Sequence, residues 1–440
     1  MPDAPAAMAS ASRILHVAAT SSPYVNGYTM RLASILEAQR AAGLHVEVVT
    51  SPFYPGRVPR EAKVEIDGVA HHRCVHPAES VGAGGLLAWL HKLRARRGVV
   101  GAAATVVEEE LLMRRLCRRI VEVARRMESD LIHVHTPYRC ACPALAAGKY
   151  LRVPVVYEVR GNWEDTAVSD GLLREGGLGY RYIRWRESRA MRRAGAVVAL
   201  CEQLARDVER RGVPAGRVFV APNGADLGRL ERASGQAQSA AEDMRGRLPA
   251  GLVVGYVGSI RPLEGVDELV DAVASMRAAG RAVVGVVVGD GPSLPALREQ
   301  ARRLGVADAV AFPGRVPPAD VGAFYDLIDV FVVSRRSSRV TDLVTPIKPL
   351  EAMGRGKAVV MSDLPALREL GEPGDAARFY RASSVPDLVA VAGRLLDDDA
   401  SRAALGARAR DWVAHERTWS RSLDATLLAY DSAARHAVSR

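Results

Sequence analysis

Short apolar runs alternate with helical stretches along most of the chain, and this alternation restricts its fold more than any other feature. Residues 12–19 are typical of a strand, residues 30–42 of a helix, and residues 44–50 of a second strand. Two parallel strands need such a crossover between them, so the pattern predicts parallel sheets covered by helices. With 440 residues, of which 48% are hydrophobic, the chain is long enough for two or three domains with full cores.

The pattern is interrupted near the middle of the chain, which indicates a boundary between two domains. Residues 218–226 read as a strand followed by Asn and Gly, and residues 233–246 are polar and weakly patterned, as expected of a surface connection. We therefore expect a first Rossmann-like α/β domain at residues 1–222 and a second at residues 223–418.

Polar residues follow two buried strands of the first half. Residues 131–138 contain His135, with His133 two residues earlier on the same strand face, and residues 153–165 end in a polar group. Active sites of open α/β sheets collect at the carboxyl ends of strands. A histidine there can hydrogen-bond or move protons near neutral pH, although one of the pair can equally be a core residue with satisfied nitrogens.

Two segments of the second half are suited to binding phosphate. Residues 253–273 predict a strand, a glycine turn and a helix, which brings backbone N–H groups up to an anion, and Arg261 lies in that turn. Residues 343–360 set Lys348 and Glu351 three residues apart where a loop becomes a helix, so both can face one ligand. A cation, a helix start and a carboxylate that accepts hydrogen bonds from sugar hydroxyls together indicate a nucleotide sugar.

Taken together, these segments resemble the retaining glycosyltransferases of family 4 over roughly the whole chain. The resemblance implies the GT-B fold, in which two Rossmann-like domains face a cleft, with the nucleotide sugar on the second domain and the acceptor on the first. Residues 419–434 resemble the terminal helix that crosses back to the first domain in this family.

The resemblance also implies roles for individual residues. Glu351 matches the second glutamate of the family's paired motif, which contacts the ribose. The first glutamate falls on Leu343, so the neighbouring Asp342 is the candidate for the sugar contact. Gly27 matches the glycine of the loop against the donor diphosphate, and His135 the histidine beside the transferred sugar. Further candidates are Gly258 and Thr345 on the donor side and Glu158, Arg160, Trp163 and Glu164 on the acceptor side, where Glu158 and Arg160 fit a structural ion pair nearly as well.

The chain departs from the family at the two cations that normally neutralise the diphosphate. It has Ser259 and Glu264 where members commonly carry Arg and Lys. We expect Arg261 and Lys348 to substitute as fixed positive charges on the leaving group. Because no convincing DxD pair is present, we expect no metal ion, and no other cofactor.

The positive charge of the chain is confined to its first half. Residues 1–220 carry 32 Lys and Arg against 22 Asp and Glu, whereas residues 221–440 carry 28 of each. Arginines are mixed with Leu, Trp or Tyr at helical spacing in residues 86–97, 111–127 and 180–193. Such helices can lie on an anionic membrane surface or present an ordinary solvated face. Nucleic acid is a weaker interpretation, since no matching motif accompanies the charge.

The expected function is that of a glycosyltransferase that moves a hexose from a UDP- or GDP-linked donor to a glycan or lipid-linked acceptor in bacterial surface polysaccharide synthesis. Without a signal peptide pattern or an apolar run of about 20 residues, we expect a cytoplasmic protein, either free or peripheral on the inner face of the membrane. A sugar-nucleotide epimerase and a non-catalytic GT-B scaffold are the alternatives.

Overall fold

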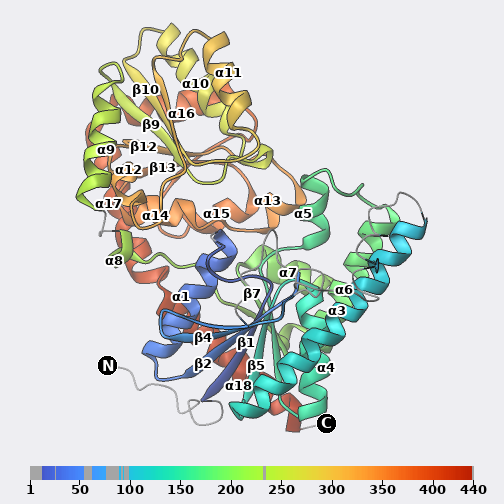
Figure 1. The fold of residues 1–440 in the computed structure, drawn as a ribbon. Coiled ribbons are helices and arrows are strands. Elements are labelled where there is room, and N and C mark those ends of the chain that lie inside the picture. Colours follow the sequence, from blue (N-terminus) through green and yellow to red (C-terminus); the bar gives the residue numbers. More distant parts are fainter. Residues whose placement is uncertain are drawn as a thin grey trace. The chain divides into compact units, whose positions relative to one another are not determined.

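The computed structural model describes residues 12–24, 26–53, 62–75, 89–90, 93, 99–230 and 234–438. The chain divides into two compact units, which we call unit 1 (Met1–Ala221 and Ser422–Arg440) and unit 2 (Pro222–Arg421). Each unit is an α/β layer structure built on a mostly or wholly parallel sheet, as Figure 1 shows. The predicted fold class, α/β with two Rossmann-like domains, is therefore confirmed.

Unit 1 contains a sheet in the order β3-β4-β2-β1-β5-β6-β7-β8, in which all neighbours are parallel except the β3 and β4 pair. The central strands β1, β5 and β6 are buried along nearly their whole length, as strands covered by helices on both faces should be. The strands are β1 (Arg13–Ala18), β2 (His45–Thr50), β3 (Lys63–Ile66), β4 (Val69–Arg73), β5 (Leu131–His135), β6 (Val155–Val159), β7 (Ala196–Ala199) and β8 (Val218–Val220).

The helices of unit 1 bury one apolar face each. In α3, for example, Leu116 and Ile120 are fully buried while the side chain of Arg114 is 69% exposed, so the Leu and Arg mixture of this segment is that of a core-packed helix with a solvated face. The helices are α1 (Gly27–Ala41), α3 (Val99–Arg126), α4 (Tyr138–Leu151), α5 (Trp163–Ser169), α6 (Leu178–Arg193), α7 (Glu202–Arg210) and α18 (Trp419–Val438). The basic stretch 86–97 lies almost wholly outside the described residues.

The terminal helix α18 packs into the core of unit 1. Its Ala429, Tyr430 and Ala433 are buried with residues of the central strands. Gly195, just before β7, lies so close to Ala433 that an added Cβ would be 3.0 Å from the Cβ of Ala433. None of the helices in the described part of the chain has a window apolar and long enough to cross a bilayer.

Unit 2 contains a wholly parallel sheet in the order β11-β10-β9-β12-β13-β14. Its strands are β9 (Leu252–Val257), β10 (Val283–Val288), β11 (Val310–Gly314), β12 (Val330–Val333), β13 (Ala358–Ser362) and β14 (Arg378–Tyr380). The helices are α8 (Leu227–Leu230), α9 (Gly235–Gly246), α10 (Val266–Ala278), α11 (Leu294–Arg303), α12 (Val321–Asp326), α13 (Arg339–Leu343), α14 (Lys348–Gly354), α15 (Pro365–Gly371), α16 (Val385–Asp397) and α17 (Asp399–Glu416).

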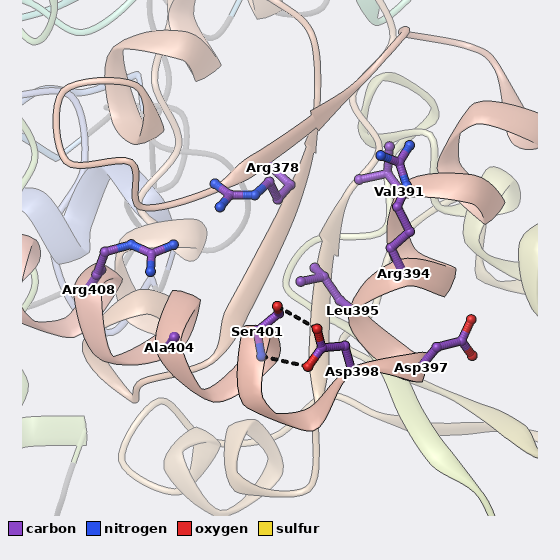
Figure 2. A pocket seen from close by; sticks show the side chains of 9 residues that line it. All are labelled: Arg378, Val391, Arg394, Leu395, Asp397, Asp398, Ser401, Ala404 and Arg408. Carbon is purple, nitrogen blue, oxygen red and sulfur yellow. Dashed lines mark hydrogen bonds between the residues drawn. The ribbon is translucent and has the colours of Figure 1, made fainter.

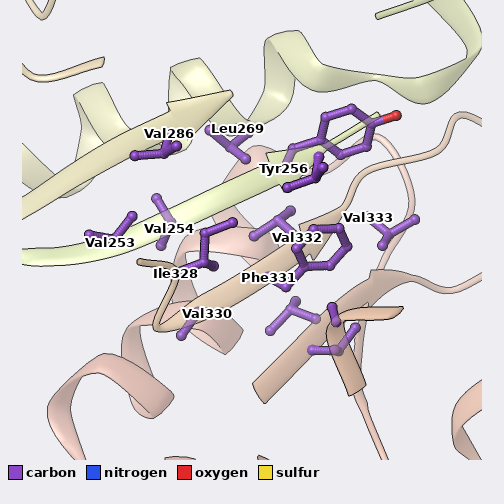
Figure 3. Packing of buried hydrophobic residues seen from close by; sticks show 14 of the residues in the cluster. Val253, Val254, Tyr256, Leu269, Val286, Ile328, Val330, Phe331, Val332 and Val333 are labelled. Carbon is purple, nitrogen blue, oxygen red and sulfur yellow. The ribbon is translucent and has the colours of Figure 1, made fainter. Parts of the chain in front are cut away.

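The core of unit 2 lies where β9, β10 and β12 meet their covering helices. Valine is the commonest residue in it. The rings of Tyr256 and Phe331 lie side by side in this core (Figure 3), with centroids 6.3 Å apart. Tyr256 carries its hydroxyl to the carboxyl end of β9, where it donates to the carbonyl of Ser259 at 2.9 Å. The packed core thus delivers a polar group to the edge at which the predicted donor residues lie.

Most described residues of the segment 233–246 are exposed, as predicted for a surface connection, but the segment forms helix α9 instead of an irregular linker. Ser234 caps this helix by accepting from the N–H of Ala237 at 3.2 Å, and the segment is rich in good helix formers. Ala237 and Ala241, four residues apart, are buried against unit 2. Alanines on one face are a weak hydrophobic signal, which is why the sequence pattern did not reveal the helix.

Candidate functional site

Lys348 lies across the end of β9, and a glycine makes room for it. Gly258 follows β9 with φ +149°, and a Cβ placed there would be 2.0 Å from Cε of Lys348. No other residue type fits this position without displacing the lysine. The N–H of Gly258 donates to the carbonyl of Val288 at 2.8 Å, so this N–H does not face a ligand. The role of Gly258 is therefore steric, which corrects the expectation that it offers a backbone donor to phosphate.

The ammonium of Lys348 is held by two partners of unit 2. It donates to the hydroxyl of Tyr256 at 2.5 Å, lies 4.9 Å from the centre of that ring, and is 3.4 Å from the carboxylate of Glu264. Burial lowers the pKa of Lys348, and Glu264 opposes that shift. The lysine is thus a fixed, partly desolvated cation on the first turn of α14.

Glu264 is a buried counter-ion, and it introduces an arginine that the sequence analysis did not identify. Arg335, which follows β12, donates from Nε and Nη2 to the two carboxylate oxygens of Glu264, each at 3.1 Å. Although burial opposes ionisation, Arg335 and Lys348 lower the pKa of Glu264 to about 2. Arg335 therefore neutralises the charge of Glu264 within unit 2, and Lys348 remains as a second cation beside this pair. The signal in the sequence was the pair of arginines directly after a buried strand.

Arg261 borders the same tyrosine as Lys348. It precedes the 3-10 turn Pro262–Glu264, is partly exposed, and its charge tends to lower the pKa of the Tyr256 phenol, which burial raises. The two cations predicted to replace the family's pair thus lie at one end of β9.

Glu351 shares the first turn of α14 with Lys348. Its carboxylate accepts from the hydroxyl of the buried Tyr325 at 2.8 Å. Burial raises the pKa of Glu351, whereas Tyr325, Arg229 and Lys348 oppose the shift. Arg229 of α8 was not anticipated, because α8 is four residues long and has no periodic pattern.

Asp342 and Thr345 lie in the segment that leads into α14. Ser338 caps the short helix α13, and the carboxylate of Asp342 accepts from the hydroxyl of Ser337 at 3.1 and 3.2 Å. Burial raises the pKa of Asp342. Thr345 is buried, and its carbonyl accepts from the amide of Asn223 at 2.9 Å. Unit 2 thus places every predicted donor residue of the second half either after β9 or in the segment that runs from α13 into α14.

His135 of unit 1 is fully buried, and both of its ring nitrogens are engaged. Nδ1 accepts from Nη2 of Arg160 at 2.8 Å, and Nε2 is 3.0 Å from Nδ1 of His16. Burial lowers the pKa of His16, His133 and His135 alike. The predicted place of His135 beside the transferred sugar is not supported by this burial, because Arg160 and His16 already engage its two ring nitrogens.

The two glutamates predicted on the acceptor side are also fully buried. Glu158 lies between Arg31 and Arg160, with 2.8 and 2.7 Å from Oε1 to their Nε atoms. Glu164 pairs with Arg211 at 2.7 Å. Their full burial in these ion pairs does not support the predicted place of either carboxylate on the acceptor surface.

Gly27 is exposed and Trp163 half-buried in unit 1, whereas the side chain of Arg160 is only 6% exposed. The guanidinium of Arg139 lies 4.2 Å from the centre of the Trp163 ring. Gly27 begins α1 directly after Asn26, whose side chain caps the helix by accepting from Thr29 N–H at 3.0 Å, and an added Cβ at Gly27 would meet nothing within 4 Å. Contact of these residues with a ligand stays a prediction.

A separate cavity of about 550 Å³ opens in unit 2 between β14, α16 and α17, and Figure 2 shows its lining. Arg378 and Arg408 both pair with Asp375, and Asp398 caps α17 by accepting from Ser401. None of the predicted site residues lines it. Its lining residues are Arg378, Val391, Arg394, Leu395, Asp397, Asp398, Ser401, Ala404 and Arg408.

Comparisons with known proteins give the same assignment for both units. A model described as glycosyl transferase 4-like domain matches residues 26–224, and one described as glycosyl transferases group 1 matches residues 251–398. The chain is 28% identical over 410 residues to a D-inositol 3-phosphate glycosyltransferase of Nocardia farcinica, which covers 89% of this chain and 85% of the relative.

A second relative and a solved structure extend this likeness. A GDP-mannose-dependent alpha-(1-6)-phosphatidylinositol monomannoside mannosyltransferase of Mycobacterium tuberculosis is 31% identical over 208 residues, 47% of this chain and 54% of the relative. The crystal structure of Anabaena HepE in complex with UDP superposes with a TM-score of 0.68 at 19% identity and covers 94% of this chain and 99% of that one. At that identity the structural likeness concerns the fold.

Proposed function

The chain belongs to the glycosyltransferases of family 4 with the GT-B fold, and from this membership we propose that it transfers a hexose, with retention of configuration, from a nucleoside diphosphate sugar. The observation that carries the proposal is the position of Lys348 over Gly258, at the carboxyl end of a parallel strand and on the first turn of a helix. Open α/β sheets bind their ligands at this edge. A desolvated cation there suits the phosphates of the donor.

The donor is a UDP- or GDP-linked hexose under this proposal. HepE was solved with UDP, and the mycobacterial relative is named as GDP-mannose-dependent, so both nucleotides occur among the similar proteins. Glu351 would accept from the ribose hydroxyls, and its bond from Tyr325 would hold the carboxylate in one orientation. Asp342 and Thr345 would lie beside the transferred sugar.

Catalysis would consist mainly of stabilising the leaving nucleoside diphosphate. Arg261 and Lys348 are the fixed cations, with Glu264 and Arg335 as the pair that holds Lys348 in place. Because these side chains supply positive charge, we propose that no metal ion is needed. A same-face displacement would then give retention, with the acceptor hydroxyl entering from the side that the diphosphate leaves.

The acceptor would be a glycan or a lipid-linked glycan of bacterial surface polysaccharide synthesis. Both relatives are named for acceptors that contain inositol, one of them a phospholipid. On α6 of unit 1, Leu178 and Trp185 are 85% and 53% exposed among arginines. Such a face favours a peripheral position on an anionic membrane, where a lipid-linked acceptor would be found. Arg160, Trp163 and Gly27 of unit 1 stay the candidates for contacts with acceptor and donor.

Replacement of Lys348 tests the proposal. Lys348→Met keeps the stem that packs on Gly258 but removes the charge, and we expect the rate of sugar transfer to fall by about 10²- to 10³-fold. Lys357→Met is the matched control, because this lysine donates to the carbonyl of Asp326 at 2.9 Å outside the proposed site. The assay is transfer from UDP- and GDP-hexoses with EDTA present, and the screen begins with thermal shifts by UDP and GDP.

Three results would overturn this proposal. The first is sugar transfer by Lys348→Met at the rate of the unmodified enzyme. EDTA could abolish transfer, which would show that a metal ion is required. A donor incubated alone could yield a new sugar stereoisomer, which would indicate an epimerase.

A further inference from the structure

Seven buried polar side chains of unit 1 form a closed circuit, which we call the polar ring. It runs from Arg160 through His135, His16, Gln39, Tyr430, His133 and Glu158 and returns to Arg160. The members come from β1, β5, β6, α1 and α18, and Gln39 and Tyr430 are 391 residues apart in the chain. All links are hydrogen bonds except the one between His133 and Glu158, which is a 3.1 Å nitrogen-to-oxygen contact. Buried polar networks of this kind restrict a core to one arrangement.

The direction of the first hydrogen bonds follows from Arg160, since a guanidinium only donates. Nη2 of Arg160 is 2.8 Å from Nδ1 of His135, so this nitrogen accepts and Nε2 of His135 carries the proton. Nε2 therefore donates to Nδ1 of His16 at 3.0 Å. Neutral His16 then carries its proton on Nε2 and donates to Oε1 of Gln39 at 2.7 Å.

The direction of the remaining contacts follows from Gln39. Its amide nitrogen donates to the hydroxyl of Tyr430 at 2.7 Å. Tyr430 therefore uses its own proton for Nδ1 of His133, also at 2.7 Å. His133 is left with a proton on Nε2, which lies 3.1 Å from Oε2 of Glu158. The other oxygen of Glu158 accepts from Nε of Arg160 and Nε of Arg31, which closes the circuit.

The remaining donor of Arg160 leaves the ring and holds the start of α1. Nη1 donates to the carbonyl of Tyr28 at 2.6 Å, and the guanidinium lies 4.4 Å from the centre of the Tyr28 ring. The Tyr28 hydroxyl accepts from the N–H of Ala19 at 2.8 Å, so both ends of the β1 to α1 connection are tied to this tyrosine. Gly27 is its immediate neighbour.

We propose that the polar ring is a positioning device, in which Tyr430 of the terminal helix fixes Arg160 and thereby the start of α1. The ring holds its three histidines neutral with the proton on Nε2 in each. Its effect on catalysis rests on the proposed function, because it acts through the Gly27 turn that the family resemblance assigns to the donor. We assign the three histidines, Gln39, Tyr430 and Glu158 as positioning residues, which act through Arg160.

The same three histidines could in principle hold a metal ion, because one nitrogen of each lies within 4.8 Å of the others. The contacts given above favour the polar ring instead, because both nitrogens of each imidazole already lie beside a polar partner. Two guanidiniums also lie at hydrogen-bonding distance from Glu158. The tautomers are therefore the measurement that separates the two interpretations.

The first test is the tautomeric state, which needs no substrate. In the ¹⁵N-histidine-labelled full chain at pH 7, long-range ¹H–¹⁵N correlation should show His16, His133 and His135 neutral with the proton on Nε2, assigned by contacts with Tyr430 and by single replacements. A proton on Nδ1 of any of the three, a charged ring, or one equivalent of bound zinc in the purified protein would overturn the ring. This outcome is independent of whether the chain transfers sugar.

The second test asks whether the ring positions α1. Tyr430→Phe removes one hydroxyl, and we expect amide exchange at residues 27–35 to accelerate about tenfold and kcat/KM for transfer to fall about tenfold. The matched control is Tyr157→Phe, which removes a buried hydroxyl bonded to Glu187 at 2.5 Å outside the ring. Equal effects of both variants on exchange at α1 would overturn the positioning role. Lost transfer with unchanged exchange would do the same.

Discussion

Replacement of Glu264 by Gln is the most direct perturbation of the charge arrangement in unit 2. The substitution keeps the shape and one carbonyl oxygen, but it removes the negative charge that lies between Arg335 and Lys348. Both cations are largely buried, with side chains 10% and 21% exposed. We therefore expect Glu264→Gln to destabilise unit 2 and to make the charged form of Lys348 less stable in its buried position.

The magnitude follows from the pKa of Glu264. A pKa that falls from its ordinary value of 4.5 to about 2 changes by roughly 2.5 pH units, and at 1.36 kcal/mol per unit this corresponds to about 3 kcal/mol of preferential ionisation in the folded state. The variant does not lose all of this free energy. Its glutamine keeps one hydrogen bond, and Lys348 can lose its proton, which leaves one stranded cation fewer. The expected loss is about 2 kcal/mol at pH 7.

The sign with pH follows from the direction of the shift. A carboxyl whose folded pKa lies below its unfolded value stabilises the protein above the unfolded pKa of about 4.5 and loses that contribution as the pH falls toward 2. The difference between the parent protein and Glu264→Gln should therefore be full at pH 7 and shrink below pH 4.5.

Urea denaturation followed by hydrogen exchange of peptides from β9 and β12 measures unit 2 separately from unit 1. The double variant Glu264→Gln with Lys348→Met should show a coupling of about 1 kcal/mol, because the second change removes one of the two stranded cations. A loss below about 0.5 kcal/mol in Glu264→Gln, or no coupling, would refute the counter-ion assignment.

Three further perturbations have defined outcomes. Gly258→Ala should lower the stability of unit 2 by about 2 kcal/mol or more and impair donor binding, since the new Cβ meets Lys348 at 2.0 Å; thermal shift with and without UDP or GDP measures both effects. Arg211→Met leaves the buried Glu164 carboxylate without its closest cation at 2.7 Å, and urea unfolding should show a loss of about 3–5 kcal/mol in unit 1, with exposed Arg114→Met as a near-neutral control. Acid should weaken unit 1 before unit 2, because the histidines of the polar ring have folded pKa values below 6.5. Below pH 6.5, the free energy of unfolding of unit 1 should fall by up to about 1.4 kcal/mol per pH unit for each of these histidines. Equal hydrogen exchange of the two units at pH 5.5 during an acid titration would contradict this.

The groups that face the three histidines determine the pH at which that acid response begins. Glu158 favours their protonation, whereas Arg31 and Arg160 oppose it, and Gln39, Tyr430 and Tyr28 are uncharged neighbours. Burial is the largest cause of the lowered pKa values, which is why the direction does not depend on any one of these neighbours.

The fold was predictable because it depends on periodic patterns. Valine-rich runs separated by helical stretches predict parallel strands wherever both faces of a sheet are covered, and the strands of both units follow that rule. Helix α9 was missed because Ala237 and Ala241 carry little hydrophobic signal. The assignment to the GT-B fold came from the sequence motifs and not from the periodic pattern.

The site was only partly predictable, because several of its roles depend on residues that are distant in sequence. In the sequence, Glu264 only marks the loss of a cation that would neutralise the diphosphate. The structure places Arg335, 71 residues away, beside it as a counter-ion. Similarly, His135 and Glu158 stand at strand ends, where sequence reasoning expects ligand contacts, but partners from α1 and α18 enclose them. Lys348 and Glu351 were identified together because three residues of spacing on one helix suffice to bring them to one face.

The placement of α18 has a consequence for how the protein is made. Residues 422–438 complete the core of unit 1, yet they leave the ribosome only after all of unit 2 has been synthesised. Until then, the hydroxyl of Tyr430 is missing from Gln39 and His133, and the surface that Ala429 and Ala433 cover is open. Unit 2 is contiguous and can complete its core as it emerges, whereas the core of unit 1 stays incomplete until residues 422–438 have been synthesised.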